Sequence, residues 1–331
     1  MQLKTCGDQP SFPMRQDLRQ LHREFLDYSE FTRSLSPDTL RGYVGSFTML
    51  MKCCPDLTPE MIDVPTMQEF FKWLQTRARK VGKNETTTGV KKSTVTTYWR
   101  KISKFFDWLK AKRIIAQNPL RSEEMQAPLV RYEDKKYLDK RNLERILDTM
   151  NFKIVWKNGF LRHRNLAIIS IALNCGLRKG ELLGLKLGDI DLDRNLITVR
   201  AETSKCRRSR LIPLNSRARQ DLEAYLNDRR ERPYMTSHLW VSDSRDSRLT
   251  AHGLKDVVTH VATRAGVSFH LHQLRHTFAV NFLVNSGQNS FKLQQLLGHR
   301  SIASTAIYTR CLPPDIMRAD MECLADLDNA L

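Results

Sequence analysis

Apolar residues recur three or four places apart through most of positions 15–112, and this is the spacing of one face of an α-helix. Pro37 and Pro65 stand where helices would begin, because proline suits the first helical turn and the hydroxyl of Ser36 can cap the turn that follows it. We predict four helices, which begin at Arg15, Ser36-Pro37, Pro65 and Ser93. Residues 15–112 should be helical throughout.

The charge of the chain limits the kind of partner it binds. The sequence has 54 Lys and Arg against 36 Asp and Glu, a net charge of +18, and its pI is near 9.8. Such a surplus favours a polyanion, most commonly nucleic acid. The predicted helical surface carries basic residues that suit phosphate contacts, although a solvated surface explains any single one of them better: Arg77, Arg79, Lys80, Lys83, Lys91, Lys92, Arg100, Lys101 and Lys104.

The same composition argues against membrane, secreted and zinc proteins. No apolar run approaches membrane-spanning length, and the N-terminal MQLKTCGDQPSF lacks the apolar core of a signal peptide. The seven cysteines form no CxxC pair, and an odd, unpatterned set is typical of reduced thiols. We therefore expect a cytoplasmic, nucleoid-associated protein with no membrane partner, no metal and no cofactor.

The sequence pattern changes after residues 116–137, which carry two prolines, many charges and no sustained periodicity. We predict a helical domain over 1–120, a linker over 121–137 and a second domain over 138–331. In the second domain an apolar helix, Leu166–Cys175, should end at Gly176, and helices should resume near Ala218. Between them the residues alternate like a three-stranded antiparallel sheet, with strands near 189–192, 196–201 and 209–214.

The stretch FHLHQLRHTF predicts a helix from near His270 to Gly287. On it His272, Arg275 and His276 share one face, and apolar residues occupy another. Such a helix would bury one side and present a cationic cluster on the other. Taken alone, the pattern is better explained by structural roles, in which the histidines bond to buried carbonyls and Arg275 pairs with a carboxylate. No companion residue completes a zinc site.

Two further sequence motifs carry cationic residues that could act together with this cluster. GLRKGEL puts Arg178 at the start of a helix, with Glu181 one turn later and able to hold its guanidinium. Lys205 falls in the turn between the second and third predicted strands.

Near the C-terminus, SFKLQQLLGHRSIASTAIYTR predicts a short helix that stops at Gly298, then His299, then a helix capped by Ser301 that delivers Tyr308. Together the boxes supply two arginines, a lysine, histidines and a tyrosine. This set suits a phosphodiester that is attacked by a protein nucleophile.

In this order and spacing the boxes resemble those of the tyrosine recombinases, the phage-integrase-type site-specific recombinases. The resemblance is strong over about 138–310, and the matching motifs are GLRKGEL, SKCRRSRLIPL, HQLRH, LGH and the tyrosine nine residues after that histidine. It implies a mainly α, two-domain fold with a small antiparallel sheet, which forms a C-clamp around DNA. Residues 1–120 would be the helical core-binding (SAM-like) domain and 138–331 the catalytic domain.

The resemblance also implies roles in a reaction that cleaves and rejoins DNA through a 3′-phosphotyrosyl link, without metal or ATP. Tyr308 would be the nucleophile, Arg178 and Arg275 would bind the scissile phosphate, Lys205 would be the general acid, His272 an acid/base and His299 a phosphate hydrogen-bond donor. An ordinary tyrosine, with a pKa of roughly 10, needs positive neighbours and a proton acceptor to attack at neutral pH. Two roles stay open for His276: it supports the catalytic residues from beside the site, or its role is purely structural.

The implied partners are double-stranded DNA with inverted-repeat core sites, three further subunits in a homotetramer on two duplexes, and an accessory directionality factor. Fewer than twenty residues precede the first predicted helix, so we expect no arm-site-binding domain. The C-terminal segment has an amphipathic pattern that would dock on a neighbouring subunit or on its own domain: Met317, Met321, Leu324 and Leu327.

Other functions remain compatible with these motifs. A type IB topoisomerase or a telomere resolvase would share the arginines and the tyrosine, and a non-catalytic DNA-binding regulator could keep the fold. Integration, excision, transposition and replicon-dimer resolution also stay open as outcomes, as do the target sequence and the length of its spacer.

Overall fold

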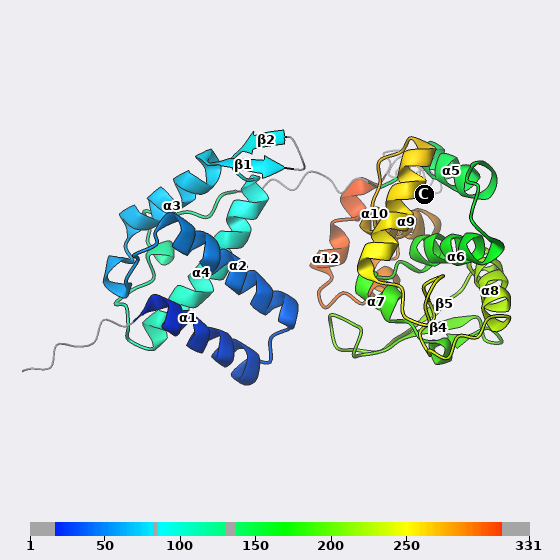
Figure 1. Ribbon diagram of the computed structural model, residues 1–331, viewed down its shortest axis with the longest axis horizontal. Coiled ribbons are helices and arrows are strands. Elements are labelled where there is room, and N and C mark those ends of the chain that lie inside the picture. Colours follow the sequence, from blue (N-terminus) through cyan, green and yellow to red (C-terminus); the bar gives the residue numbers. More distant parts are fainter. Residues whose placement is uncertain (1–16, 82–84, 130–136, 313–331) are drawn as a thin grey trace, which may run out of the picture. The chain divides into compact units, whose positions relative to one another are not determined.

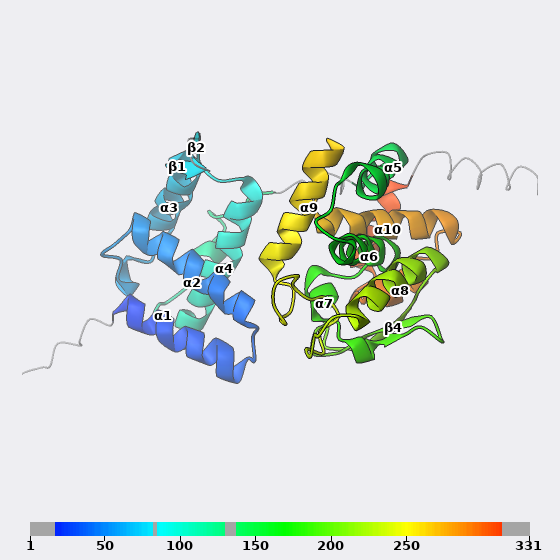
Figure 2. The same cartoon turned by 45° about the vertical axis from the view of Figure 1, so that its right-hand side comes forward.

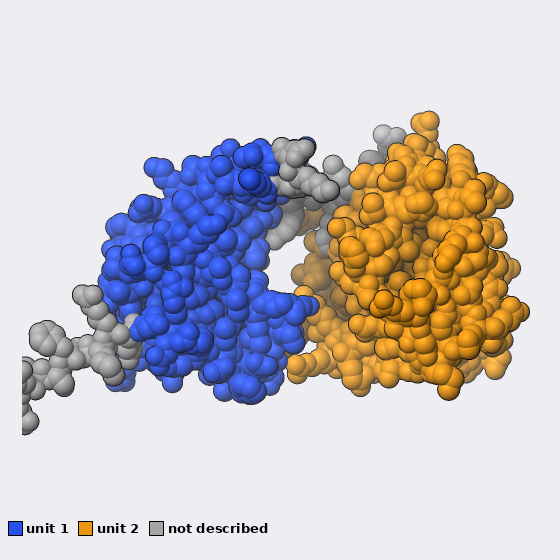
Figure 3. Space-filling view, in the orientation of Figure 1, with its two compact units in different colours: residues 1–131 blue, residues 132–331 orange. Residues whose placement is uncertain are grey.

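The computed structural model describes residues 17–81, 85–129 and 137–312, and the chain divides into two compact units, Met1–Arg131 and Tyr132–Leu331 (Figure 3). Each unit has its own apolar core. The division lies inside the predicted linker 121–137, and residues up to Pro128 still contact unit 1, where the carbonyl of Pro128 accepts from Thr96 Oγ1 at 3.2 Å. The predicted C-terminal amphipathic segment lies outside the described residues.

Four helices build unit 1 (Figure 1): α1 (Leu18–Asp27), α2 (Pro37–Cys53), α3 (Val64–Thr76) and α4 (Lys92–Ala111). A π-helical turn, Tyr28–Thr32, extends α1, and 3-10 turns occupy Pro59–Met61 and Pro119–Arg121. As predicted, the side chain of Ser36 caps α2, and prolines stand in the first turns of α2 and α3. The apolar faces meet in an aromatic core in which Phe25 and Phe105 touch.

Unit 1 is not helical throughout, so that prediction was wrong. β1 (Ala78–Val81) pairs with β2 (Glu85–Thr88) in an antiparallel hairpin. The threonines of β2 favour extended backbone. The hairpin side chains that the structure describes are exposed or half-buried. The sequence of the hairpin therefore lacks the alternation of apolar and polar residues that would predict two strands. The predicted Ser93 cap was also wrong, because α4 begins at Lys92 with Lys91 as its N-cap.

Unit 2 is a larger set of helices (Figure 2): α5 (Lys140–Asp148), α6 (Gly159–Cys175), α7 (Lys179–Gly184), α8 (Ser216–Arg230), α9 (Ala251–Ala265), α10 (Leu271–Asn285), α11 (Ser290–Leu297) and α12 (Ala303–Ala306). A π-helical turn, Thr149–Lys153, follows α5, and 3-10 turns occupy Leu187–Asp189 and η6 (Thr309–Cys311). α6 packs against both α8 and α10. It begins earlier than predicted, with Asn158 as its cap, and ends at Gly176 as predicted.

The three-stranded sheet has the predicted position and the antiparallel order β3 (Ile190–Asp191), β4 (Leu196–Val199), β5 (Arg210–Pro213). Ile197 pairs with Ile212, and both are buried in the core. This face anchors the sheet. The connection from β4 to β5 carries Lys205, whose side chain is exposed.

The burial of one face of α10 differs from the prediction. His270 caps it and Leu274 enters the core as predicted. Arg275 and His276, however, are buried rather than presented on an exposed cationic face, and only His272 of the three is exposed. The reason is that α11 and the segment around Tyr308 pack over this side of α10.

Candidate active site

The turn between α6 and α7 positions Arg178. Gly176 ends α6 in the left-handed conformation, with φ of 61°, and Arg178 is the N-cap residue of α7. As predicted, Glu181 holds this arginine: one carboxylate oxygen accepts from Arg178 Nη1 and the other from its backbone N–H, both at 2.9 Å. Arg178 Nη2 donates to the carbonyl of Gly298 at 3.2 Å. Its guanidinium is thus fixed from two sides.

Glu181 is the shared acceptor of the site. Besides Arg178 it binds Arg210 of β5 in a bidentate pair, at 3.1 and 2.7 Å, and Arg275 Nη1 lies 3.9 Å from Glu181 Oε2. Burial raises the pKa of Glu181, but Arg210 and Arg178 more than offset this, so its pKa lies below the ordinary value. The carboxylate is therefore charged at neutral pH and balances the neighbouring arginines.

Arg275 lies at the centre of the site with 1 % of its surface exposed. Its Nη1 donates to the carbonyl of Gly176 at 2.5 Å and its Nη2 to the carbonyl of Leu297 at 2.8 Å. Nη2 also lies 3.1 Å from Nε2 of His299. Burial and the charge of Arg178 lower the pKa of Arg275 to about 10, with Glu181 opposing them, so the guanidinium stays charged at neutral pH.

His299 follows the turn that ends α11. Gly298 takes φ of 60° there, as the predicted stop requires. His299 Nδ1 lies 2.8 Å from Thr305 Oγ1, so the imidazole is held between Thr305 and Arg275. Its ring stacks parallel to that of Tyr308, with centroids 6.3 Å apart.

Tyr308 lies between α12 and η6, not within a helix that delivers it. α12 ends at Ala306 and its N-cap is Ile302, although Ser301 Oγ does accept from the backbone of Ala303 at 3.3 Å. The Tyr308 side chain is 1 % exposed. Its hydroxyl lies 3.0 Å from Nδ1 of His276. Burial raises the pKa of Tyr308, while the charge of Arg275 and its hydrogen bond to the hydroxyl act in the opposite direction.

Lys205 and His272 are exposed, unlike the other predicted site residues. Lys205 lies in the β4–β5 connection, whose next residue, Cys206, donates from Sγ to the carbonyl of Gly298 at 3.2 Å. That carbonyl is the one that Arg178 also binds, so the connection is tied to the site. The ring of His272 stands edge-on to that of His276, with centroids 4.3 Å apart.

Sequence reasoning missed Arg210 and Thr305. The signal for Arg210 was present, because alternation along β5 puts Arg210 on the same face as the buried Ile212, while Leu211 between them is 54 % exposed. An arginine on the inner face of a strand needs a buried partner. Thr305 had no such signal in its short helix.

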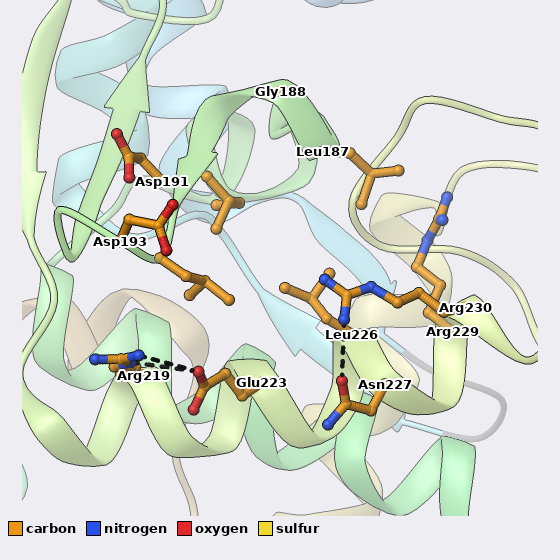
Figure 4. Close-up of a pocket in the computed structure, with 12 residues that line it drawn as sticks. Leu187, Gly188, Asp191, Asp193, Arg219, Glu223, Leu226, Asn227, Arg229 and Arg230 are labelled. Atoms are coloured by element: carbon orange, nitrogen blue, oxygen red, sulfur yellow. Dashed lines mark hydrogen bonds and ion pairs between the residues drawn. The ribbon is translucent and has the colours of Figure 1, made fainter.

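Two observations bear on other kinds of site. Among residues 17–81, 85–129 and 137–312, no group of three or more His, Cys, Asp or Glu side chains is placed to hold a metal ion, and no helix is long and apolar enough to cross a membrane. Figure 4 shows a hollow between Leu187–Asp193 and α8, where Arg219 pairs with Glu223 at 3.3 Å. It contains none of the predicted site residues.

A family model described as the phage integrase family matches residues 136–313, which is more than half of the chain. The chain belongs to this family. A second model, the phage integrase SAM-like domain, matches residues 18–125. As a phage integrase family member, the protein is a site-specific DNA recombinase of the tyrosine type, an enzyme that cleaves and rejoins DNA strands.

Curated relatives agree with this family. The tyrosine recombinase XerC of Bacillus subtilis is 28 % identical over 232 residues, 67 % of this chain and 71 % of the relative. The XerC of Listeria monocytogenes is 28 % identical over 296 residues, 87 % of this chain and 92 % of the relative.

Solved structures share the fold. The Tn1549 transposon integrase in complex with circular intermediate DNA has a TM-score of 0.71 at 19 % identity and covers 91 % of this chain and 98 % of its own. The XerH site-specific recombinase bound to a palindromic difH substrate has a TM-score of 0.70 at 19 % identity, over 92 % of this chain and 84 % of its own.

Proposed function

We propose that Tyr308 is the nucleophile of this recombinase and that Arg178, Arg275, Lys205, His272 and His299 complete its catalytic site. One observation carries the proposal: Glu181 and Arg275 bring together side chains from distant parts of the sequence. Arg178 and Arg275 share the carboxylate of Glu181, and Arg275 contacts His299. The positive charge of Arg275 acts to lower the pKa of Tyr308.

The arginines suit a phosphate whose negative charge grows in the transition state. Arg178 is half-buried, and Glu181 already orients its guanidinium. Its remaining N–H groups can therefore donate to a non-bridging oxygen with little further loss of side-chain entropy. Arg275 supplies a second fixed positive charge. His299, held by Thr305, would donate to the same phosphate from Nε2, which would exchange its present contact with Arg275 for the phosphate oxygen.

In the proposed reaction the Tyr308 oxygen forms a bond to phosphorus and the bond from phosphorus to the 5′ oxygen breaks. The 5′ oxygen takes a proton from Lys205, whose exposed loop suits a group that must reach DNA. His272 would serve as an acid/base near the tyrosine. The 3′-phosphotyrosyl link retains the energy of the broken bond, so a new 5′ hydroxyl can reverse the step without ATP.

The proposed partners are double-stranded DNA with inverted-repeat core sites, other copies of the chain in a homotetramer on two duplexes, and an accessory directionality factor. The net charge of +18 supports a DNA partner. In this proposal 1–120 is the core-binding domain, 121–137 the linker and 138–331 the catalytic domain, and the protein acts at the cytoplasmic nucleoid.

The test is covalent trapping on nicked duplexes that carry candidate inverted repeats, without metal or ATP. Wild-type protein should give a protein–DNA adduct on a denaturing gel. Tyr308→Phe should bind the same duplexes and give none, because it loses only the attacking oxygen. An adduct of equal yield with Tyr308→Phe would exclude Tyr308 as nucleophile. DNA binding without any wild-type adduct would favour the non-catalytic regulator.

A further inference from the structure

The hydroxyl of Tyr308 lies 3.0 Å from Nδ1 of His276, and both side chains are buried. A neutral imidazole accepts a hydrogen bond at one ring nitrogen and donates from the other, so Nδ1 accepts from the hydroxyl when Nε2 carries the hydrogen of the ring. The positive charge of Arg275 favours the ionised form of the tyrosine.

We propose that His276 is the proton acceptor for Tyr308, and so a catalytic residue in its own right. The proposal rests on the function proposed above, and it assigns the uptake of the tyrosine proton to His276 in place of His272. Nδ1 is the accepting atom, and the neutral ring then carries its hydrogen on Nε2.

The other nearby side chains suit this role less well. His299 uses Nε2 toward Arg275 and Nδ1 toward Thr305, and its ring stacks on that of Tyr308 instead of pointing at the hydroxyl. His272 is exposed, whereas His276 is only 5 % exposed and Tyr308 only 1 %. A buried hydroxyl cannot pass its proton directly to bulk water, so an internal acceptor is needed.

The proposed step balances. The proton moves from Tyr308 Oη to His276 Nδ1 as the oxygen attacks phosphorus, and the 5′ oxygen leaves with a proton from Lys205. In rejoining, the 5′ hydroxyl gives its proton back to Lys205 as its oxygen attacks phosphorus, the bond from phosphorus to the tyrosine oxygen breaks, and His276 returns its proton to that oxygen. Positive charge formed on His276 is opposed by Arg275 but lies beside a developing dianionic phosphorane, which favours it.

The decisive experiment separates the nucleophile side of the reaction from the leaving-group side. Nicked duplexes are prepared with an ordinary 5′ oxygen or with a 5′-bridging sulfur at the scissile phosphate, and rates of adduct formation are measured for the full-length protein. A thiolate leaves without protonation, so the sulfur substrate removes the need for a general acid. His276→Asn keeps a hydrogen-bond acceptor but cannot take up a proton at neutral pH.

We expect His276→Asn to slow adduct formation by about 100-fold or more on both substrates. Lys205→Ala should be slow only on the oxygen substrate. His276→Gln is the second variant, in case Asn perturbs the fold, and DNA binding with thermal unfolding checks each protein. His252→Asn is the matched control, because its side chain on α9 is 84 % exposed, and it should act like wild type.

A pH profile distinguishes proton transfer from positioning. Without an acceptor, the tyrosine must ionise by itself, so the rate of His276→Asn should rise about tenfold per pH unit through pH 7–9 while the wild-type rate levels off. Among the described residues, the ionisable groups at His276 and Tyr308 are unchanged in this comparison: the ring of His272 stands edge-on to that of His276, and Arg275 and Cys311 act on the charge of Tyr308.

Three results would overturn the proposal. His276→Asn and His276→Gln could react at the wild-type rate, their deficit could vanish on the sulfur substrate, or their pH profile could run parallel to that of the wild type. In each case the wild-type adduct still forms, so the proposed function survives. Absence of a wild-type adduct on both substrates would reject the proposed function and this proposal together.

Discussion

Histidines in this chain have different environments, and burial decides what each can do. His22 is enclosed in unit 1, where its ring stacks on Phe47 with centroids 3.9 Å apart and meets the edge of Phe105. His276 is equally buried but faces a hydroxyl, and His272 faces solvent. A buried histidine thus packs among aromatic rings in one case and faces a hydroxyl in the other.

The burial of His22 predicts that unit 1 loses stability in acid. Burial lowers the pKa of His22 from 6.5 to about 4, with a backbone hydrogen bond to Tyr43 opposing it. The folded state then binds fewer protons than the unfolded state, so this stability is present above pH 6.5 and is lost as the pH falls toward 4. The loss should reach about 2–3 kcal/mol.

Hydrogen exchange at pH 7.5 and pH 4.5 measures this effect in peptides from α1, α2 and α4. In His22→Leu, the fall in protection between the two pH values should shrink by the same free energy. An unchanged pH dependence in this variant would assign the acid sensitivity to other groups.

At the scale of elements, β5 links the separate parts of the site. Arg210 binds Glu181 through both Nη atoms and donates from Nε to the carbonyl of Leu296 at 2.8 Å. One side chain therefore connects the sheet, the start of α7 and the end of α11. The proposed site residues come from separately capped elements, and the contacts of Arg210 join three of these elements.

Arg210→Ala should therefore lower the free energy of unfolding by more than the loss of an ordinary ion pair does. It leaves a carboxylate that is 1 % exposed without its bidentate partner, so we expect a loss of about 3–5 kcal/mol in the free energy of unfolding. Adduct formation should fall as well. The control is Arg219→Ala, which breaks an ion pair in the exposed hollow of Figure 4 and should cost less than about 1 kcal/mol. Equal losses in denaturant titrations would contradict the assigned role of Arg210.

Two glycines with the same backbone test how closely the end of α11 is packed. Gly298 and Gly287 have φ of 60° and 57°. A Cβ on Gly298 would lie 2.9 Å from Arg210 Nη1, whereas one on Gly287 would meet nothing within 4 Å. Both alanine variants should lose about 1–2 kcal/mol through backbone strain. Only Gly298→Ala should also slow adduct formation, and equal activities in the trapping assay would contradict this.

At the scale of the whole molecule, each unit has a separate core. The aromatic core of unit 1 and the aliphatic core of unit 2 share no residue. Each unit is large enough to bury a core of its own. We therefore expect one unit to stay folded when the core of the other is destabilised.

Phe106→Ala tests this independence. Phe106 is fully buried in unit 1, and its truncation should cost about 3–5 kcal/mol. Hydrogen exchange of the full chain should then show lost protection in α1–α4 and unchanged protection in α6, α8 and α10. Similar losses in both units would mean that the two cores unfold together.

Local signals in the sequence determined much of this protein. Helical spacing, proline and serine at helix starts, and glycine at Gly176 and Gly298 placed most helices, because these signals act within one turn of the backbone. Strand alternation located the sheet of unit 2. The order of the five boxes indicated the family, which the family model confirms. The roles assigned to the individual site residues stay predictions.

Tertiary structure decided what depends on contacts distant in sequence. The hairpin of unit 1 has no apolar period, so only its strand pairing reveals it. The burial of Arg275 and His276 follows from α11 and Tyr308 packing over α10, and the shared use of Glu181 by three arginines follows from the meeting of α7, β5 and α10. Sequence spacing shows which side chains share a helix face. Only packing decides whether that face meets solvent or a tyrosine hydroxyl.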